Sequence, residues 1–207
     1  ADIGEQSSAS NNTVALAGEG SVWLCTNSST GMRVGVQGSG SALVVESGAN
    51  VKSQSGSVGY FTNSSNNSVH IYGAGAAWTM PGSFSVGGSD NSVTISQGGV
   101  LISSNAWISS GASSSNNTVV VAGVGALWTN ASKLNLGGSG SSRLTVANGG
   151  TVAALSEIVI ASSNTSTSSL NFGSLGGTDA AGSVVSPAIK FGSGNGAINF
   201  NQINSLT

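Results

Sequence analysis

The chain has 207 residues, which suits a single domain and is long enough to bury a continuous core. Only 6% of its residues are charged and its formal net charge is −2, whereas roughly 25% of residues are charged in a typical soluble domain. This balance excludes a strongly basic nucleic-acid surface and a strong electrostatic attraction to anionic membranes.

Glycine is abundant, with 32 residues, and a chain rich in glycine and serine can be a flexible linker. However, 38% of the residues are hydrophobic, and they gather in short β-branched runs such as 13–16, 118–121 and 158–160. Disordered chains lack such runs, because they cannot bury enough apolar surface to offset the cost of ordering. No run approaches the ~20 apolar residues that cross a bilayer. We therefore expect a folded chain without membrane insertion.

From the N-terminus, residues 1–8 contain no strand-like run, and we expect a cap or a disordered segment there. A block then follows that reads Ser-Asn-Asn-Thr/Ser-Val and runs through Gly-x-Gly to a tryptophan. It occurs three times, at residues 10–23, 65–78 and 115–128. A second block, Leu/Val-x-Val/Ile-x-x-Gly, is offset from the first and lies at residues 43–48, 93–98 and 144–149.

Short runs that end in a small residue lie between these blocks, and their alternation has the period of two that is typical of strands. The clearest are 32–35, 84–87, 134–137 and 189–192, with weaker counterparts at 58–60, 106–109 and 158–161. Gly-Gly and Gly-Ser pairs between the runs predict sharp turns. No segment longer than about ten residues has a convincing helical period.

The size of the repeat separates two all-β architectures. The three tryptophans lie 55 and then 50 residues apart, which is close to the length of a propeller blade, but three copies cannot close a propeller ring. A parallel β-helix instead uses about 20 to 30 residues for each turn of its coil, here called a rung, and the half-repeat of about 25 residues fits that size. We therefore predict one β-helix over residues 1–207, with about eight rungs of ~25 residues.

Stacked rungs place equivalent residues in rows, and the repeat predicts two such rows. Asn11, Asn66 and Asn116 are expected to align at every second rung and to form a structural ladder in which side chains hydrogen-bond along the row. Trp23, Trp78 and Trp128 are expected to form a second ladder. Flat indole faces can also stack on sugar rings, but large aromatic side chains are mostly buried, which favours a packing role.

The motifs offer little for catalysis. The Gly-x-Gly pairs lack the third glycine and the following helix of a nucleotide-binding loop, so they predict turns. His70 is the only histidine and its counterparts in the repeat, Ala15 and Val120, do not titrate, which argues against a catalytic triad. Cys25 is the only cysteine, and we expect a small buried hydrophobic residue.

Carboxylates and metal-ligand patterns are equally sparse. Glu19 aligns with Ala74 and Val124, so the seven acidic residues form no row. Residues 87–90 are similar to part of a calcium-binding nonapeptide but have no tandem copies. We therefore predict no catalytic residue, no cofactor and no metal site.

Several segments resemble a known family. Residues 128–130, 134–140 and 144–152 resemble the β-strand repeats of autotransporter passengers, the surface proteins of bacterial type V secretion, and residues 189–201 resemble their G-x-G-x-[LI]-x-F-N segment. The resemblance extends from about residue 10 to residue 201. It implies a right-handed parallel β-helix on the outer surface of a Gram-negative cell, commonly adhesive or self-associating. The sequence contains no membrane barrel and no inserted globular domain, so we expect a passenger fragment without enzymatic activity.

The leading hypothesis is an extracellular, non-enzymatic surface protein that acts in adhesion, self-association or biofilm formation. Its rows of Ser, Thr and Asn would bind a second copy, or a protein or glycan of a neighbouring or host cell, through many weak contacts. An alternative is a structural subunit of an extracellular fibre, in which the ends of β-helices stack strand to strand. A third possibility, a polysaccharide lyase or hydrolase, needs clustered carboxylates, and we expect the acids to be dispersed.

Overall fold

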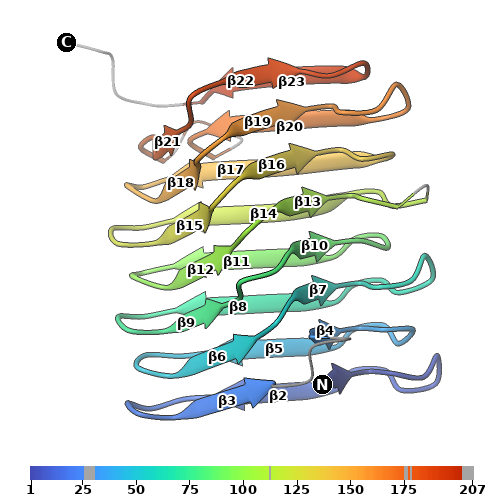
Figure 1. The fold of residues 1–207 in the computed structure, drawn as a ribbon, viewed down its shortest axis with the longest axis vertical. Helices are drawn as coiled ribbons and strands as arrows, with labels where there is room; N and C mark the ends of the chain where they lie inside the picture. Colours follow the sequence, from blue (N-terminus) through green and yellow to red (C-terminus); the bar gives the residue numbers. More distant parts are fainter. Residues whose placement is uncertain (26–30, 112, 175–176, 178, 202–207) are drawn as a thin grey trace.

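The chain folds into a single parallel β-helix, as predicted (Figure 1). The computed structural model describes residues 1–25, 31–111, 113–174, 177 and 179–201. All of the regular elements in these residues are β-strands. They form seven rungs of three strands and a last rung of two, and the coil that they follow is right-handed.

The first strand of each rung belongs to sheet A, in which every strand pairs in parallel with its equivalent one rung away. The strong and weak runs that end in a small residue all lie in this sheet. One of them is shifted, since the run expected at residues 58–60 is a strand that already ends at Val58, before Gly59 turns the backbone with a φ of 68°. The strands of sheet A are β1 (Asp2–Ile3), β4 (Met32–Val34), β7 (Gly56–Val58), β10 (Phe84–Val86), β13 (Ala106–Ile108), β16 (Lys133–Leu136), β19 (Glu157–Ile160) and β22 (Ile189–Phe191).

The second and third strands of each rung form sheets B and C, which are parallel throughout in the same way. Sheet B consists of β2 (Thr13–Leu16), β5 (Ala42–Val45), β8 (Ser68–Tyr72), β11 (Ser92–Ser96), β14 (Asn117–Ala122), β17 (Ser141–Ala147), β20 (Thr167–Phe172) and β23 (Asn195–Phe200). Sheet C consists of β3 (Val22–Cys25), β6 (Asn50–Ser53), β9 (Ala77–Thr79), β12 (Val100–Ser103), β15 (Leu127–Asn130), β18 (Thr151–Ala154) and β21 (Ser183–Val185).

The N-terminal segment differs from the expectation of a cap or a disordered segment over residues 1–8. Asp2 and Ile3 pair with Arg33 and Val34 of β4, so they already belong to sheet A. Ile3 is buried, and Arg33 donates two hydrogen bonds of 2.7 Å to the Asp2 carboxylate. A strand of two residues is too short to produce a recognisable alternation, which explains why the sequence did not reveal it.

The core explains why the repeat is 50 residues long although one rung has about 25. In sheet C, Trp78 and Trp128 occupy the same register position two rungs apart, and Leu101 lies between them. Trp23 holds the corresponding position two rungs before Trp78. In sheet A, large and small residues also alternate from rung to rung, but here the small residue stands in the rungs that hold a tryptophan in sheet C. The aligned row of sheet A contains Met32, Gly56, Phe84, Ala106 and Leu134.

Each buried indole therefore shares its rung with a small residue of sheet A. A Cβ atom built on Gly56 would lie 2.6 Å from Cζ2 of Trp78, so the glycine makes room for the ring. In the rung between the two indoles, Phe84 packs edge-on against Trp78 and Trp128, with ring centroids 5.5 and 6.2 Å apart. Two rungs thus form one packing unit, because interiors tolerate neither voids nor excess volume.

This packing can be tested by changing the side-chain volumes at positions 56 and 78, which lie in the same rung. Gly56→Ala is expected to destabilise the rod, because the added methyl group meets the Trp78 ring and overpacking costs about 1–3 kcal/mol. Trp78→Leu removes the ring, so the double variant is expected to lose less stability than the two single losses added together. Urea unfolding of the four proteins measures these free energies.

Val124→Ala serves as the control, because this side chain is 85% exposed and its truncation is expected to leave the unfolding midpoint unchanged. Additive losses from Gly56→Ala and Trp78→Leu would contradict the packing argument.

Candidate functional site

The predicted row of Asn11, Asn66 and Asn116 lies at one register position, two rungs apart, just before strands of sheet B. Their backbones have φ values of 58°, 57° and 55°, in the left-handed region that asparagine tolerates. Gly40 and Asp90 fill the intervening rungs with the same conformation. This row therefore marks a repeated bend of the chain.

The hydrogen-bonded ladder is formed by the residue that follows this row, and it runs through consecutive rungs. Asn67, Asn91 and Asn117 are completely buried. The backbone N–H of Asn67 donates to Oδ1 of Asn91 at 2.7 Å, and the N–H of Asn91 donates to Oδ1 of Asn117 at 2.9 Å. The Nδ2 groups donate to backbone carbonyls, such as that of Gly87 at 2.7 Å. The ladder is thus displaced by one residue from the predicted one, and its role is structural.

The tryptophan row also belongs to the core. Trp78 and Trp128 have no exposed surface, and the indole N–H of Trp78 donates to Oγ of Ser53 at 2.9 Å. Trp23 is partly buried and packs against the same core. The two buried rings cannot stack on sugars, so the packing interpretation holds for them.

The residues considered for catalysis are separated in space. His70 is exposed on the outer face of sheet B, where Val44 and Thr94 flank it in the register. Two lysines, Lys133 and Lys190, form ion pairs with Glu157 and hold its pKa at about 2. Among the described residues, no three of the His, Cys, Asp and Glu side chains lie together in a group that could hold a metal ion.

Two further interpretations are supported by the structure. Cys25 is buried, and burial raises the pKa of its thiol, so it is a small apolar core residue. Gly73 and Gly75 have φ values of 88° and 78° and form the turn between β8 and β9. The Gly-x-Gly pair thus shapes a turn between sheets B and C.

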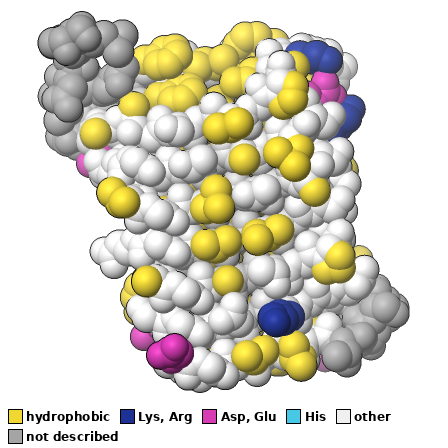
Figure 2. All heavy atoms as spheres, turned by 60° about the vertical axis from the view of Figure 1, so that its left-hand side comes forward, with side chains coloured by type: hydrophobic (Ala, Val, Ile, Leu, Met, Phe, Trp, Pro, Cys, Tyr) yellow, Lys and Arg dark blue, Asp and Glu magenta, His cyan; other side chains and the backbone are white. Residues whose placement is uncertain are grey.

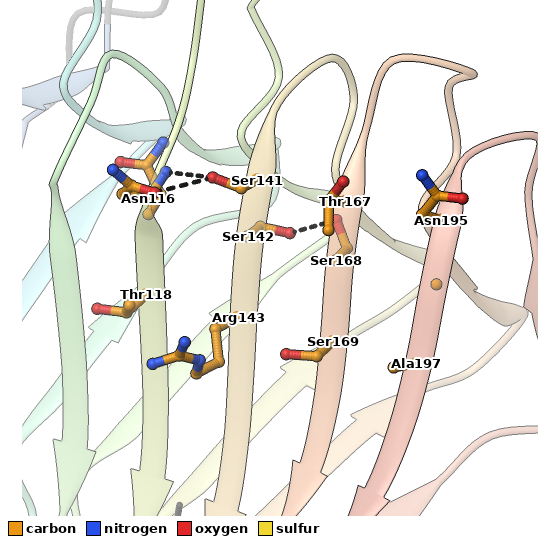
Figure 3. A pocket seen from close by; sticks show the side chains of 12 residues that line it. Asn116, Thr118, Ser141, Ser142, Arg143, Thr167, Ser168, Ser169, Asn195 and Ala197 are labelled. Atoms are coloured by element: carbon orange, nitrogen blue, oxygen red, sulfur yellow. Dashed lines mark hydrogen bonds between the residues drawn. The ribbon is translucent and has the colours of Figure 1, made fainter.

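Sequence reasoning missed a hollow of about 540 Å³ on sheet B, near the beginnings of four strands (Figure 3). We call it the sheet B groove. It opens where the buried asparagine row changes to smaller residues, since Asn117 is followed in register by Ser142, Ser168 and Gly196. Its lining residues come from β14, β17, β20 and β23 and from the residue before β14, and they are Asn116, Asn117, Thr118, Ser141, Ser142, Arg143, Thr167, Ser168, Ser169, Asn195, Gly196 and Ala197.

The groove contains an upper row of polar side chains. This row runs across the strands through Asn116, Ser141, Thr167 and Asn195. Ser141 Oγ donates to Oδ1 of Asn116 at 3.0 Å and accepts the backbone N–H of Asn116 at 2.8 Å. In the described part of the chain, the Thr167 hydroxyl and the Asn195 side-chain amide have no protein hydrogen-bond partner, so both can bind a ligand.

Arg143 is the charged residue of the groove. It projects from β17, between Thr118 of β14 and Ser169 of β20, which occupy the same register position (Figure 3). It is exposed and forms no ion pair with any residue that the structure describes. A second hollow of about 280 Å³ adjoins Arg143 and Thr118, so the guanidinium lies where the two hollows meet.

The second hollow brings a carboxylate to the other side of Arg143. Asp179 lines it together with Ser174, in the segment between β20 and β21. Hydrogen bonds from Asn148 and Ser174 lower the pKa of Asp179, so this group is anionic near neutral pH. Together, the sheet B groove and the second hollow thus offer one cation, one anion and several hydroxyl and amide groups.

Comparison of the chain with protein-family models, with curated proteins and with solved structures found no match. Within the described residues there is no helix that is long and apolar enough to cross a membrane. A function for this chain is therefore inferred from the chemistry of the rod and its groove.

The asparagine ladder gives a direct test of the corrected row. Asn91→Asp keeps an acceptor for the Asn67 N–H but loses the donors to the carbonyls of Ser64 and Gly87. A buried carboxylate would then face carbonyl oxygens, and we expect a loss of about 2 kcal/mol or more in the free energy of unfolding.

The matched control is Asn66→Asp, in the row of bends. Asp90 occupies the equivalent place one rung later with a φ of 58°, so we expect a change of less than about 0.5 kcal/mol. Equal losses from the two variants in urea unfolding would overturn the assignment of the ladder.

Proposed function

We propose that this chain is a non-enzymatic rod of a bacterial cell surface that acts in adhesion, self-association or biofilm formation. The resemblance of its repeats to autotransporter passengers supports this role and this extracellular location. The observation that carries the proposal is the sheet B groove, which polar groups from four stacked strands line.

The groove favours binding over catalysis. Its polar groups are hydroxyls, amides and one guanidinium, held at strand spacings of about 4.8 Å by the sheet behind them. Each exposed hydrogen bond is weak, because it replaces one to water. Many rods on one surface would nevertheless bind strongly through multivalency. A glycan or a polar protein surface of a neighbouring cell suits such a site.

One face of the rod agrees with a surface that makes repeated weak contacts. Figure 2 shows a face on which uncharged side chains dominate, with hydrophobic ones scattered among them. Leu24, Ile102 and Val185 are exposed on sheet C. Low charge reduces the repulsion between copies, which favours self-association as part of the same function.

A fibre subunit is the second candidate, and the charges of sheet A favour it. Asp2 of β1 and Lys190 of β22 hold the same register position in the first and the last strand of the sheet. If copies stacked end to end in this register, Lys190 would lie beside Asp2 of the next copy. Regular filaments in electron micrographs would support this candidate, and discrete rods would oppose it.

Adhesion can be tested by filling the groove. Beads that carry the chain are expected to adhere to bacterial or host cells, and Ala197→Trp, which places a large side chain in the groove, is expected to reduce adhesion about tenfold. Val44→Trp, on the outer face of β5 in the same sheet but outside the groove, is the matched control, and it is expected to adhere like the unchanged chain. Failure of the unchanged chain to adhere, or equal adhesion of the two variants, would contradict the proposal.

A further inference from the structure

We infer that the sheet B groove binds a saccharide with one acidic group in the bound segment, and that Arg143 receives the carboxylate or sulfate of that group. This inference rests on the proposed binding function and specifies its ligand.

The fold does not account for Arg143. Arg33 is paired with Asp2, and Lys133 and Lys190 are paired with Glu157. Arg143 and Lys52 form no ion pair with a described residue, and of these two only Arg143 lies in the groove. Its planar guanidinium presents a fork of donors that matches a carboxylate or a sulfate through two parallel hydrogen bonds.

Neutral hydroxyl and amide groups surround the arginine. Ser169 lies beside Arg143 in the register, and the Thr167 hydroxyl and Asn195 amide project from the next two strands of the same groove. Hydroxyl and amide groups both donate and accept, as sugar hydroxyls do. A volume of about 540 Å³ is that of an ordinary ligand site, so a short saccharide segment fits.

A nearby carboxylate limits the charge of the ligand. Asp179 is anionic and lies in the hollow on the other side of Arg143. It would repel a second acidic group there, whereas it can accept hydrogen bonds from neutral hydroxyls. A segment with one acid flanked by neutral sugar hydroxyls therefore fits better than a densely sulfated chain or a nucleic acid.

The experiment compares four probes by calorimetry on the folded chain. They are an oligosaccharide that alternates uronic acid with a neutral sugar, the same oligosaccharide with its carboxyl groups reduced to alcohols, a densely sulfated oligosaccharide, and the free uronic acid. We expect the uronic acid probe to bind best, and each of the others to bind about tenfold more weakly.

Two variants test whether Arg143 is the residue that binds the acidic group of the saccharide. Arg143→Gln is expected to weaken binding of the uronic acid probe about tenfold and to leave binding of the reduced probe unchanged. Lys52→Gln is the control, because it removes a cation from sheet C, away from the groove. It is expected to change neither affinity.

The outcomes separate this inference from the proposed function. Equal binding of the acidic and the reduced probes, or no effect of Arg143→Gln, would overturn the inference. Tighter binding of the sulfated probe would also overturn it, and so would equally tight binding of free uronic acid, since the saccharide would then contribute nothing. In each case, adhesion that is still lost with Ala197→Trp would leave the groove as the adhesive surface, whereas failure of adhesion itself would overturn both.

Discussion

Parallel pairing of each strand with its equivalent one rung later is the constraint on which the rest of this structure depends. Because the register does not slip, each position of the repeat becomes a row along the rod. An inward row must be small or apolar, and a buried polar row must satisfy its own hydrogen bonds. The asparagines of the ladder meet the second requirement, since each Oδ1 accepts the backbone N–H of its neighbour.

Because the register is constant, a change of residue between equivalent positions of two rungs is a local change in packing or in the surface. In the core, the volume of Trp78 is compensated by Gly56 in the same rung, and in the next rung the larger ring is Phe84 of sheet A, with Leu101 in sheet C. On sheet B, the asparagine row gives way to serine and glycine in the rungs that carry the groove. The proposed site thus lies where the repeat departs from its own pattern.

The sequence predicted the β-helix, its rung length and the alignment of the tryptophans, because these depend on period and spacing alone. It did not predict that Asn91 belongs to the ladder, because residues 89–91 are Ser-Asp-Asn, whereas the repeated blocks have Ser-Asn-Asn at the equivalent positions. It also gave no sign of the groove. That site requires knowing which side chains of sheet B lie beside Arg143, and its register partners Thr118 and Ser169 stand in unlike sequence surroundings.

The distance between spin labels at Leu24 and Val185 tests the stacked register most directly. Both side chains are exposed on sheet C, six strand spacings apart along the rod. With Cys25 replaced by serine, pulsed electron paramagnetic resonance should report one narrow distance of ~29 Å, because parallel strands are about 4.8 Å apart. Labels at Leu24 and Thr129, four spacings apart, should give ~19 Å. Distances that are broad, or that do not scale with the number of rungs, would contradict the account.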